Sequence, residues 1–76
     1  MIEELDRIVL TTNIPEHHLQ VGDIGTVVLV HQEGIGYEVE FMMLLGETIA
    51  VISLFAKQVR AIVHGEIAQV RDIVSA

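Results

Sequence analysis

The sequence predicts an all-β protein, a small five-stranded barrel with one short helical turn and a C-terminal strand or short helix. Two observations lead to this fold class. Hydrophobic residues make up 51% of the chain and aromatic residues only 4%, so the apolar mass is Ile, Val and Leu. These side chains gather in short runs bounded by turn-forming residues, which is typical of strands joined by tight connections.

The length of the chain allows one domain. Residues 1–76 are expected to form a single unit, with a core over 7–63 and a tail over 64–76. A chain of this size buries only about 60% of its unfolded surface. The mean hydropathy of +0.56 is high for so small an interior, so another subunit or protein is expected to cover part of the apolar surface.

The segment 21–31 is the part around which the barrel is expected to curl. Gly22 and Asp23 are typical of a tight turn. Gly25 lies inside the apolar run that follows, where a glycine indicates a bulge or a close approach of two backbones. These three residues are the predicted structural turn.

The first predicted strand covers residues 7–12, and residues 13–20 form a loop that contains Pro15. Leu19 and Val21 are expected to tuck this loop back onto the core. The second strand covers residues 24–31. Its alternate positions are apolar on both sides, Ile24, Val28 and Val30 on one and Val27 and Leu29 on the other. This pattern predicts a strand covered on both faces.

A hairpin loop is predicted at residues 32–36, with two glycines to supply positive φ. Residues 37–41 then alternate between apolar and acidic side chains. Because successive side chains of a strand point to opposite faces, Tyr37, Val39 and Phe41 are expected in the core, and Glu38 and Glu40 in solvent.

The remaining elements follow a turn at residues 42–46. A fourth strand is predicted at 47–54, a helical turn at 55–59 and a fifth strand at 60–63. The tail at 66–74 fits either an added strand or a short helix. Five short strands with one helical turn before the last describe an SH3-like barrel.

The order of short motifs resembles a known family. Leu19, Gly22-Asp23-Ile24-Gly25-Thr26-Val27-Val28, Tyr37-Glu38-Val39-Glu40-Phe41, Gly46-Glu47-Thr48-Ile49-Ala50 and Arg60 are similar to the short bacterial domain-of-unknown-function family four-nine-two-six. The resemblance runs from about residue 7 to 63. It implies an SH3-like barrel and brings no established activity and no catalytic residues. It also implies a partner in a small paired system, such as the neutralising component of a toxin–antitoxin or immunity pair.

Two more distant resemblances exist. The segment 22–28 is similar to the KOW motif of ribosomal and transcription-elongation proteins. The barrel domain of the nitrile hydratase β subunit resembles this chain at Gly22, Gly25, Val27, Tyr37, Val39, Phe41, Leu45, Gly46, Ser53 and Leu54. A tryptophan common in that barrel is Leu45 here. The metal chemistry of that enzyme sits on its other subunit, so this resemblance implies an accessory role.

No catalytic, cofactor or metal site is predicted. The chain has no cysteine, which excludes disulfides and thiolate ligands. Adjacent His17 and His18 lack the usual ligand spacing, so they are interpreted as an exposed loop, with metal binding as the alternative. His31 and His64 are isolated. Ser53 is interpreted as a buried or edge hydroxyl, and Glu38 and Glu40 lack the burial that raises a pKa.

The net charge of −7 indicates basic partners or simple solubility. Nucleic acid is not expected as a partner, because only Arg7, Lys57, Arg60 and Arg71 can meet phosphates. The acidic start of the chain is unlike a signal peptide and no apolar run is long enough for a membrane helix, so a cytoplasmic protein is expected. Four acidic residues are expected to face a basic partner: Glu33, Glu38, Glu40 and Glu47.

The sequence thus predicts a non-enzymatic barrel that works through protein–protein interaction and forms a homo-oligomer. A neutralising, antitoxin- or immunity-like role is one form of this hypothesis. The alternatives are a KOW-like nucleic-acid-binding module and an accessory subunit of a larger enzyme. The expected interface is apolar and contains Met42, Met43, Leu44, Leu45, Phe55, Ile67, Val70 and Ile73.

Overall fold

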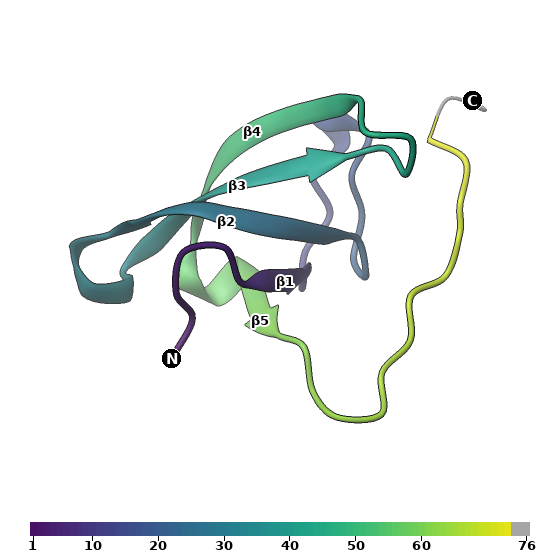
Figure 1. Cartoon of the computed structure of the whole chain (residues 1–76). Coiled ribbons are helices and arrows are strands. Elements are labelled where there is room, and N and C mark those ends of the chain that lie inside the picture. Colours follow the sequence, from purple (N-terminus) through teal and green to yellow (C-terminus); the bar gives the residue numbers. More distant parts are fainter. Residues whose placement is uncertain (74–76) are drawn as a thin grey trace.

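The computed structural model describes residues 1–73 and contains one antiparallel sheet of five strands (Figure 1). The strands are β1 (Arg7–Leu10), β2 (Ile24–His31), β3 (Gly36–Met42), β4 (Thr48–Phe55) and β5 (Val59–Ala61). The helical elements in these residues are 3-10 turns: η1 (Pro15–His17), η2 (Gln32–Gly34) and η3 (Ala56–Gln58). The all-β prediction and the helical turn before the last strand are confirmed.

The strands lie in the order β4-β3-β2-β1-β5, so the first strand sits between the second and the fifth. Every neighbouring pair is antiparallel. Within residues 1–73, β4 pairs only with β3 and β5 only with β1, which leaves these two strands at the edges of the sheet. No helix in this part of the chain is long and apolar enough to cross a lipid bilayer.

One cluster of buried hydrophobic residues forms the core. Its fully buried side chains come from three neighbouring strands and are Ile8, Leu10, Val27, Val39 and Phe41. Tyr37 joins them with 5% exposure, as the alternating pattern of residues 37–41 predicts. Glu38 and Glu40 point away from the core.

Gly25 is a position where a glycine is needed for packing. A Cβ atom there would lie 2.5 Å from Cγ1 of Val39 and 2.8 Å from Cε1 of Phe41. These are side-chain atoms, and the bulge of β2 lies between Val27 and Leu29, so Gly25 makes room for core side chains rather than for the predicted bulge or second backbone. Gly22 has φ +95°, and the backbone N–H of Gln20 donates to Oδ2 of Asp23 at 2.8 Å, which confirms the turn.

The prediction that β2 is covered on both faces is wrong for this chain by itself. The register of β2 against β3 shifts between Val27 and Leu29, so one extra residue interrupts the alternation. Val27 is fully buried, whereas Val28 and Leu29 are 40% and 45% exposed. A bulge of this kind cannot be read from apolar content. Val21 is also exposed, contrary to prediction, while Leu19 is buried.

The β2–β3 loop differs from the prediction in its glycines. Gly34 has φ +96°, as expected, but the other positive φ angles belong to Gln32 and Glu33 rather than to Gly36. Gly36 is buried at the start of β3, where a Cβ would lie 2.8 Å from the carbonyl oxygen of Leu54.

Residues 62–73 form neither a strand nor a helix, contrary to the prediction for the tail. After β5 the chain runs through residues 62–73 with turns and bends only, and it loops away from the sheet before returning (Figure 1). Polar and charged residues separate the apolar residues of this segment. Among the apolar residues of 62–73, only Ile73 packs against the core. Val74, part of the predicted element, lies outside the described residues.

Candidate interaction surface

The side of the β2–β3–β4 sheet that faces away from the core carries an unusual mixture of apolar and acidic side chains. Register pairs Leu29 with Glu38, Glu38 with Ser53, Glu40 with Val51 and Gly36 with Phe55. Residues directly opposite each other point to the same face. We call this surface the outer face and define it by Leu29, His31, Glu38, Glu40, Val51, Ser53 and Phe55.

Glu38 lies at the centre of a polar cluster that spans three strands. Nε2 of His31 on β2 lies 2.6 Å from Oε2 of Glu38, and the Ser53 hydroxyl on β4 donates to the same oxygen. The hydrogen bond from Ser53, followed by that from His31, lowers the pKa of Glu38 below its usual value. The carboxylate is therefore held in one position and kept ionised.

This cluster has the wrong order for nucleophilic catalysis. An activated serine donates to an imidazole, which is in turn oriented by a carboxylate. Here the Ser53 hydroxyl donates to the carboxylate of Glu38 instead. The arrangement fixes a negative charge and does not activate a nucleophile.

Next to this cluster the surface is hollowed and apolar. This hollow has a volume of about 370 Å³ and lies at the end of β4. Another cavity, with a volume of about 420 Å³, lies at the tail. The lining residues of the hollow at the end of β4 are His31, Gln32, Ile35, Gly36, Ser53, Leu54 and Phe55. Ile35 and Phe55 are 60% and 64% exposed, so they form an open apolar rim beside the fixed charge.

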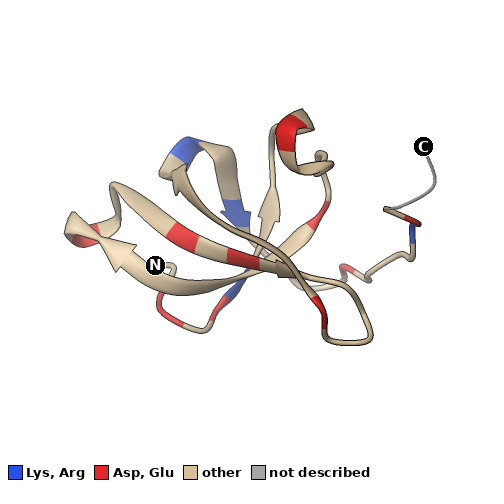
Figure 2. Ribbon diagram, turned by 90° about the horizontal axis from the view of Figure 1, so that it is seen from above, with Lys and Arg blue, Asp and Glu red and all other residues tan. Residues whose placement is uncertain are grey.

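Acidic residues dominate the charged positions of the sheet and loops, as Figure 2 shows. A second carboxylate on the outer face, Glu40, accepts a hydrogen bond of 2.8 Å from the Thr48 hydroxyl. Two of the four cationic side chains are paired with acids elsewhere. Arg60 forms an ion pair of 2.6 Å with Glu66, and Arg71 forms one with Asp23.

The eight apolar residues predicted as an interface do not form one patch. Leu44 and Leu45 are 86% and 101% exposed at the tip of the β3–β4 hairpin, with Met42 and Met43 beside them. Phe55 lies at the end of β4 that is far from this hairpin. At about 3.3 Å per residue, the two ends of β4 are roughly 23 Å apart. Ile67 and Val70 are exposed on the tail, whereas Ile73 is half-buried against the core.

Sequence reasoning did not place Leu29, His31, Val51 and Ser53 on the surface that carries Glu38. The alternation in residues 37–41 shows that Glu38 points outward. Which side chains of β2 and β4 stand beside it depends on strand register, and the bulge after Val27 changes that register.

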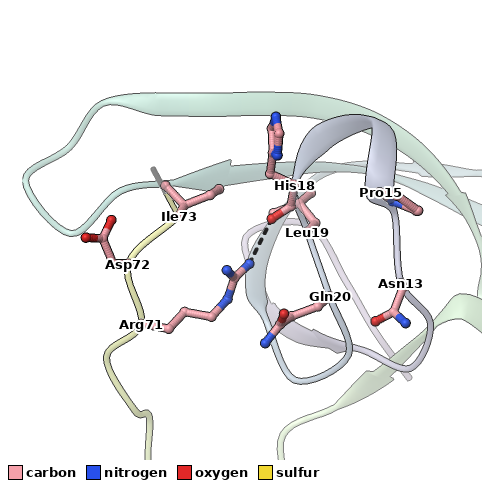
Figure 3. A pocket seen from close by; sticks show the side chains of 8 residues that line it. All are labelled: Asn13, Pro15, His18, Leu19, Gln20, Arg71, Asp72 and Ile73. Atoms are coloured by element: carbon pink, nitrogen blue, oxygen red, sulfur yellow. Dashed lines mark hydrogen bonds between the residues drawn. The ribbon is translucent and has the colours of Figure 1, made fainter. Parts of the chain in front are cut away.

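A second hollow lies between the tail and the loop before β2 (Figure 3). It is lined by Asn13, Pro15, His18, Leu19, Gln20, Arg71, Asp72 and Ile73. Arg71 donates to the carbonyl oxygen of His18 at 2.9 Å and to both carboxylate oxygens of Asp23. The hydrogen bond with Asp23 raises the pKa of Arg71. The guanidinium is thus used to hold the tail against the loop.

The two neighbouring histidines of this loop, His17 and His18, have different surroundings. His18 lines the hollow and has φ +60°, whereas His17 ends the turn η1 and is not among the lining residues. Across residues 1–73, no three His, Asp or Glu side chains are grouped to hold a metal ion.

Residues 4–61 match the family model described as "Domain of unknown function (DUF4926)". This match covers all five strands and ends before the tail. No curated protein and no solved structure matches the chain.

Proposed function

The chain belongs to the DUF4926 family, and from its outer face we propose that it is an SH3-like barrel that self-associates and binds a basic protein partner. The strand order β4-β3-β2-β1-β5 and the 3-10 turn between β4 and β5 support the SH3-like topology. The proposed activity is binding and not catalysis, with a neutralising role toward the partner.

The observation that carries the proposal is the pairing of fixed carboxylates with exposed apolar side chains on one face. Leu29, Val51 and Phe55 are 45%, 53% and 64% exposed around Glu38 and Glu40. Protein interfaces bury apolar residues at their centre, and charges placed there set partner choice. Glu38 and Glu40 are each held by a neighbouring hydroxyl, so less side-chain entropy is lost on binding.

The charge of the chain supports a basic partner. Its net charge of −7 gives a negative potential that attracts cationic proteins and speeds their encounter. The same charge opposes binding to phosphate. Arg60 and Arg71 are already paired with Glu66 and Asp23, which leaves Arg7 and Lys57 as cations without an ion pair within residues 1–73. Nucleic-acid binding is therefore the weaker alternative.

Co-purification with the protein encoded by the neighbouring reading frame tests this proposal. The double substitution Glu38→Gln and Glu40→Gln removes two charges from the outer face and is expected to weaken the complex at least about tenfold. The matched control is Glu3→Gln with Glu4→Gln, which removes two charges from the N-terminal segment. An equal loss in both variants, or no complex with the unmodified chain, would contradict a basic partner on this face.

A further inference from the structure

We propose that two copies of this chain join through the free edge of β4, so that their sheets continue as one across a two-fold axis. The proposal deepens the self-association in the proposed function by naming the strand that mediates it. It rests on the contrast between the two edges of the sheet and on the sequence of β4 and its flanks.

The two edges of the sheet differ in how they are protected. Native proteins guard exposed edges by making them short or by placing charges on them. β5 has three residues and carries the charged Arg60. β4 has eight residues, TIAVISLF, with neither a charge nor a proline among them. Its outer backbone groups have no strand partner within the described residues.

A symmetric pair of antiparallel strands restricts the register. Residues opposite each other point to the same face, so the core sides of the two copies match only when a residue of β4 faces its own equivalent. Two registers keep most of the strand paired, one centred on Val51 and one on Ile52.

The register centred on Ile52 is complementary in both packing and charge. It places the half-buried Ile52 side chains of the two copies against each other on the core side, with Ala50 opposite Leu54. It also places Glu47, just before β4, at the same end of the paired strands as η3 of the other copy, which carries Lys57, twice by symmetry. Neither residue has an ion pair within residues 1–73. This complementarity favours a second copy over an unrelated strand.

Light scattering and sedimentation over a range of concentrations test the pairing. The unmodified chain is expected to form a dimer. Val51→Lys places two like charges close to the two-fold axis and is expected to raise the dimer dissociation constant at least about tenfold. Val63→Lys is the matched control, because Val63 has a similar exposure, 59% against 53%, but lies outside β4. The thermal melting of each variant shows that it is folded.

A charge exchange tests the register. Glu47→Lys and Lys57→Glu are each expected to weaken the dimer several-fold, and the double variant to restore it. A dimer that tolerates Val51→Lys would overturn pairing through β4 and leave self-association standing. An unmodified chain that stays monomeric would overturn both. A double variant as weak as the single ones would overturn the Ile52 register. Binding of a basic partner is judged separately, by the Glu38 and Glu40 variants.

Discussion

Arg71 and Asp23 lie 48 residues apart in the sequence and form a two-pronged ion pair, with Nε of Arg71 donating to Oδ1 of Asp23 at 2.8 Å. The side chains are 32% and 16% exposed. This contact joins the tail, which lies outside the part of the chain that matches the family, to the turn before β2. A guanidinium bound to both oxygens of a carboxylate has a defined geometry.

Arg71→Gln is expected to release the tail while leaving the sheet intact. Partly exposed ion pairs contribute little, so the free energy of unfolding should fall by less than about 1 kcal/mol. Hydrogen exchange in residues 62–73 should become faster, with β1–β5 unchanged. Arg7→Gln, at a cation without an ion pair within residues 1–73, is the control. Unchanged exchange in the tail would contradict its attachment by Arg71.

Gly25→Ala is expected to destabilise the fold strongly, because the new Cβ would overlap Val39 and Phe41 in a fully packed core. Overpacking of this kind costs about 3 kcal/mol. Gly46→Ala is the comparison, since no atom lies within 4 Å of the added Cβ and only its φ of +102° is strained, at about 1 kcal/mol. Urea unfolding measures both, and equal effects would argue against the close approach at Gly25.

The Arg60–Glu66 pair is expected to appear in the acid titration of the protein. The hydrogen bonds from Arg60 and from the backbone of Val63 lower the pKa of Glu66 to about 2. Because the folded-state pKa is depressed, the pair contributes stability above the ordinary glutamate pKa of 4.5, and this contribution is lost as the pH falls toward about 2. NMR titration measures the midpoint, and Arg60→Gln should raise it. A midpoint near 4.5 in the unmodified chain would contradict the pair.

Ser53→Ala is expected to raise the pKa of Glu38, because it removes the hydrogen bond that lowers this pKa most. His31→Phe should produce a smaller rise. In the unmodified chain the depressed pKa stabilises the fold above the ordinary pKa of a glutamate, and this effect disappears as the pH falls through the folded-state value. NMR titration of Glu38 in the two variants measures both shifts. A larger rise in His31→Phe would show that the imidazole dominates.

The sequence was sufficient to predict elements with a clear period or clear punctuation. Tyr37, Val39 and Phe41 alternate with glutamates, so their burial follows from the pleat of a strand. The turn at Gly22 and Asp23 follows from residue chemistry in the same way. These predictions depend on local rules, and the structure confirms them.

Features that depend on pairing between strands were not predictable. The bulge between Val27 and Leu29 decides which apolar residues of β2 face solvent, and nothing in the run of β-branched residues marks it. The cluster of His31, Glu38 and Ser53 joins three strands through register alone. The prediction for the tail was wrong for another reason. Its spaced apolar residues fit the periods of both a strand and a helix, and contacts made by Arg71 and Ile73 determine its path.

The shortness of β5 limits how far such an assembly can grow. A chain with two unprotected sheet edges would add subunits head to tail and produce fibrils, as in aggregates built from stacked sheets. Here the edge strand β5 has only three residues, including the charged Arg60, so it offers few backbone groups to an additional subunit. Pairing through β4 covers the long edge strand of both molecules at once, so the dimer has no edge at which further subunits add.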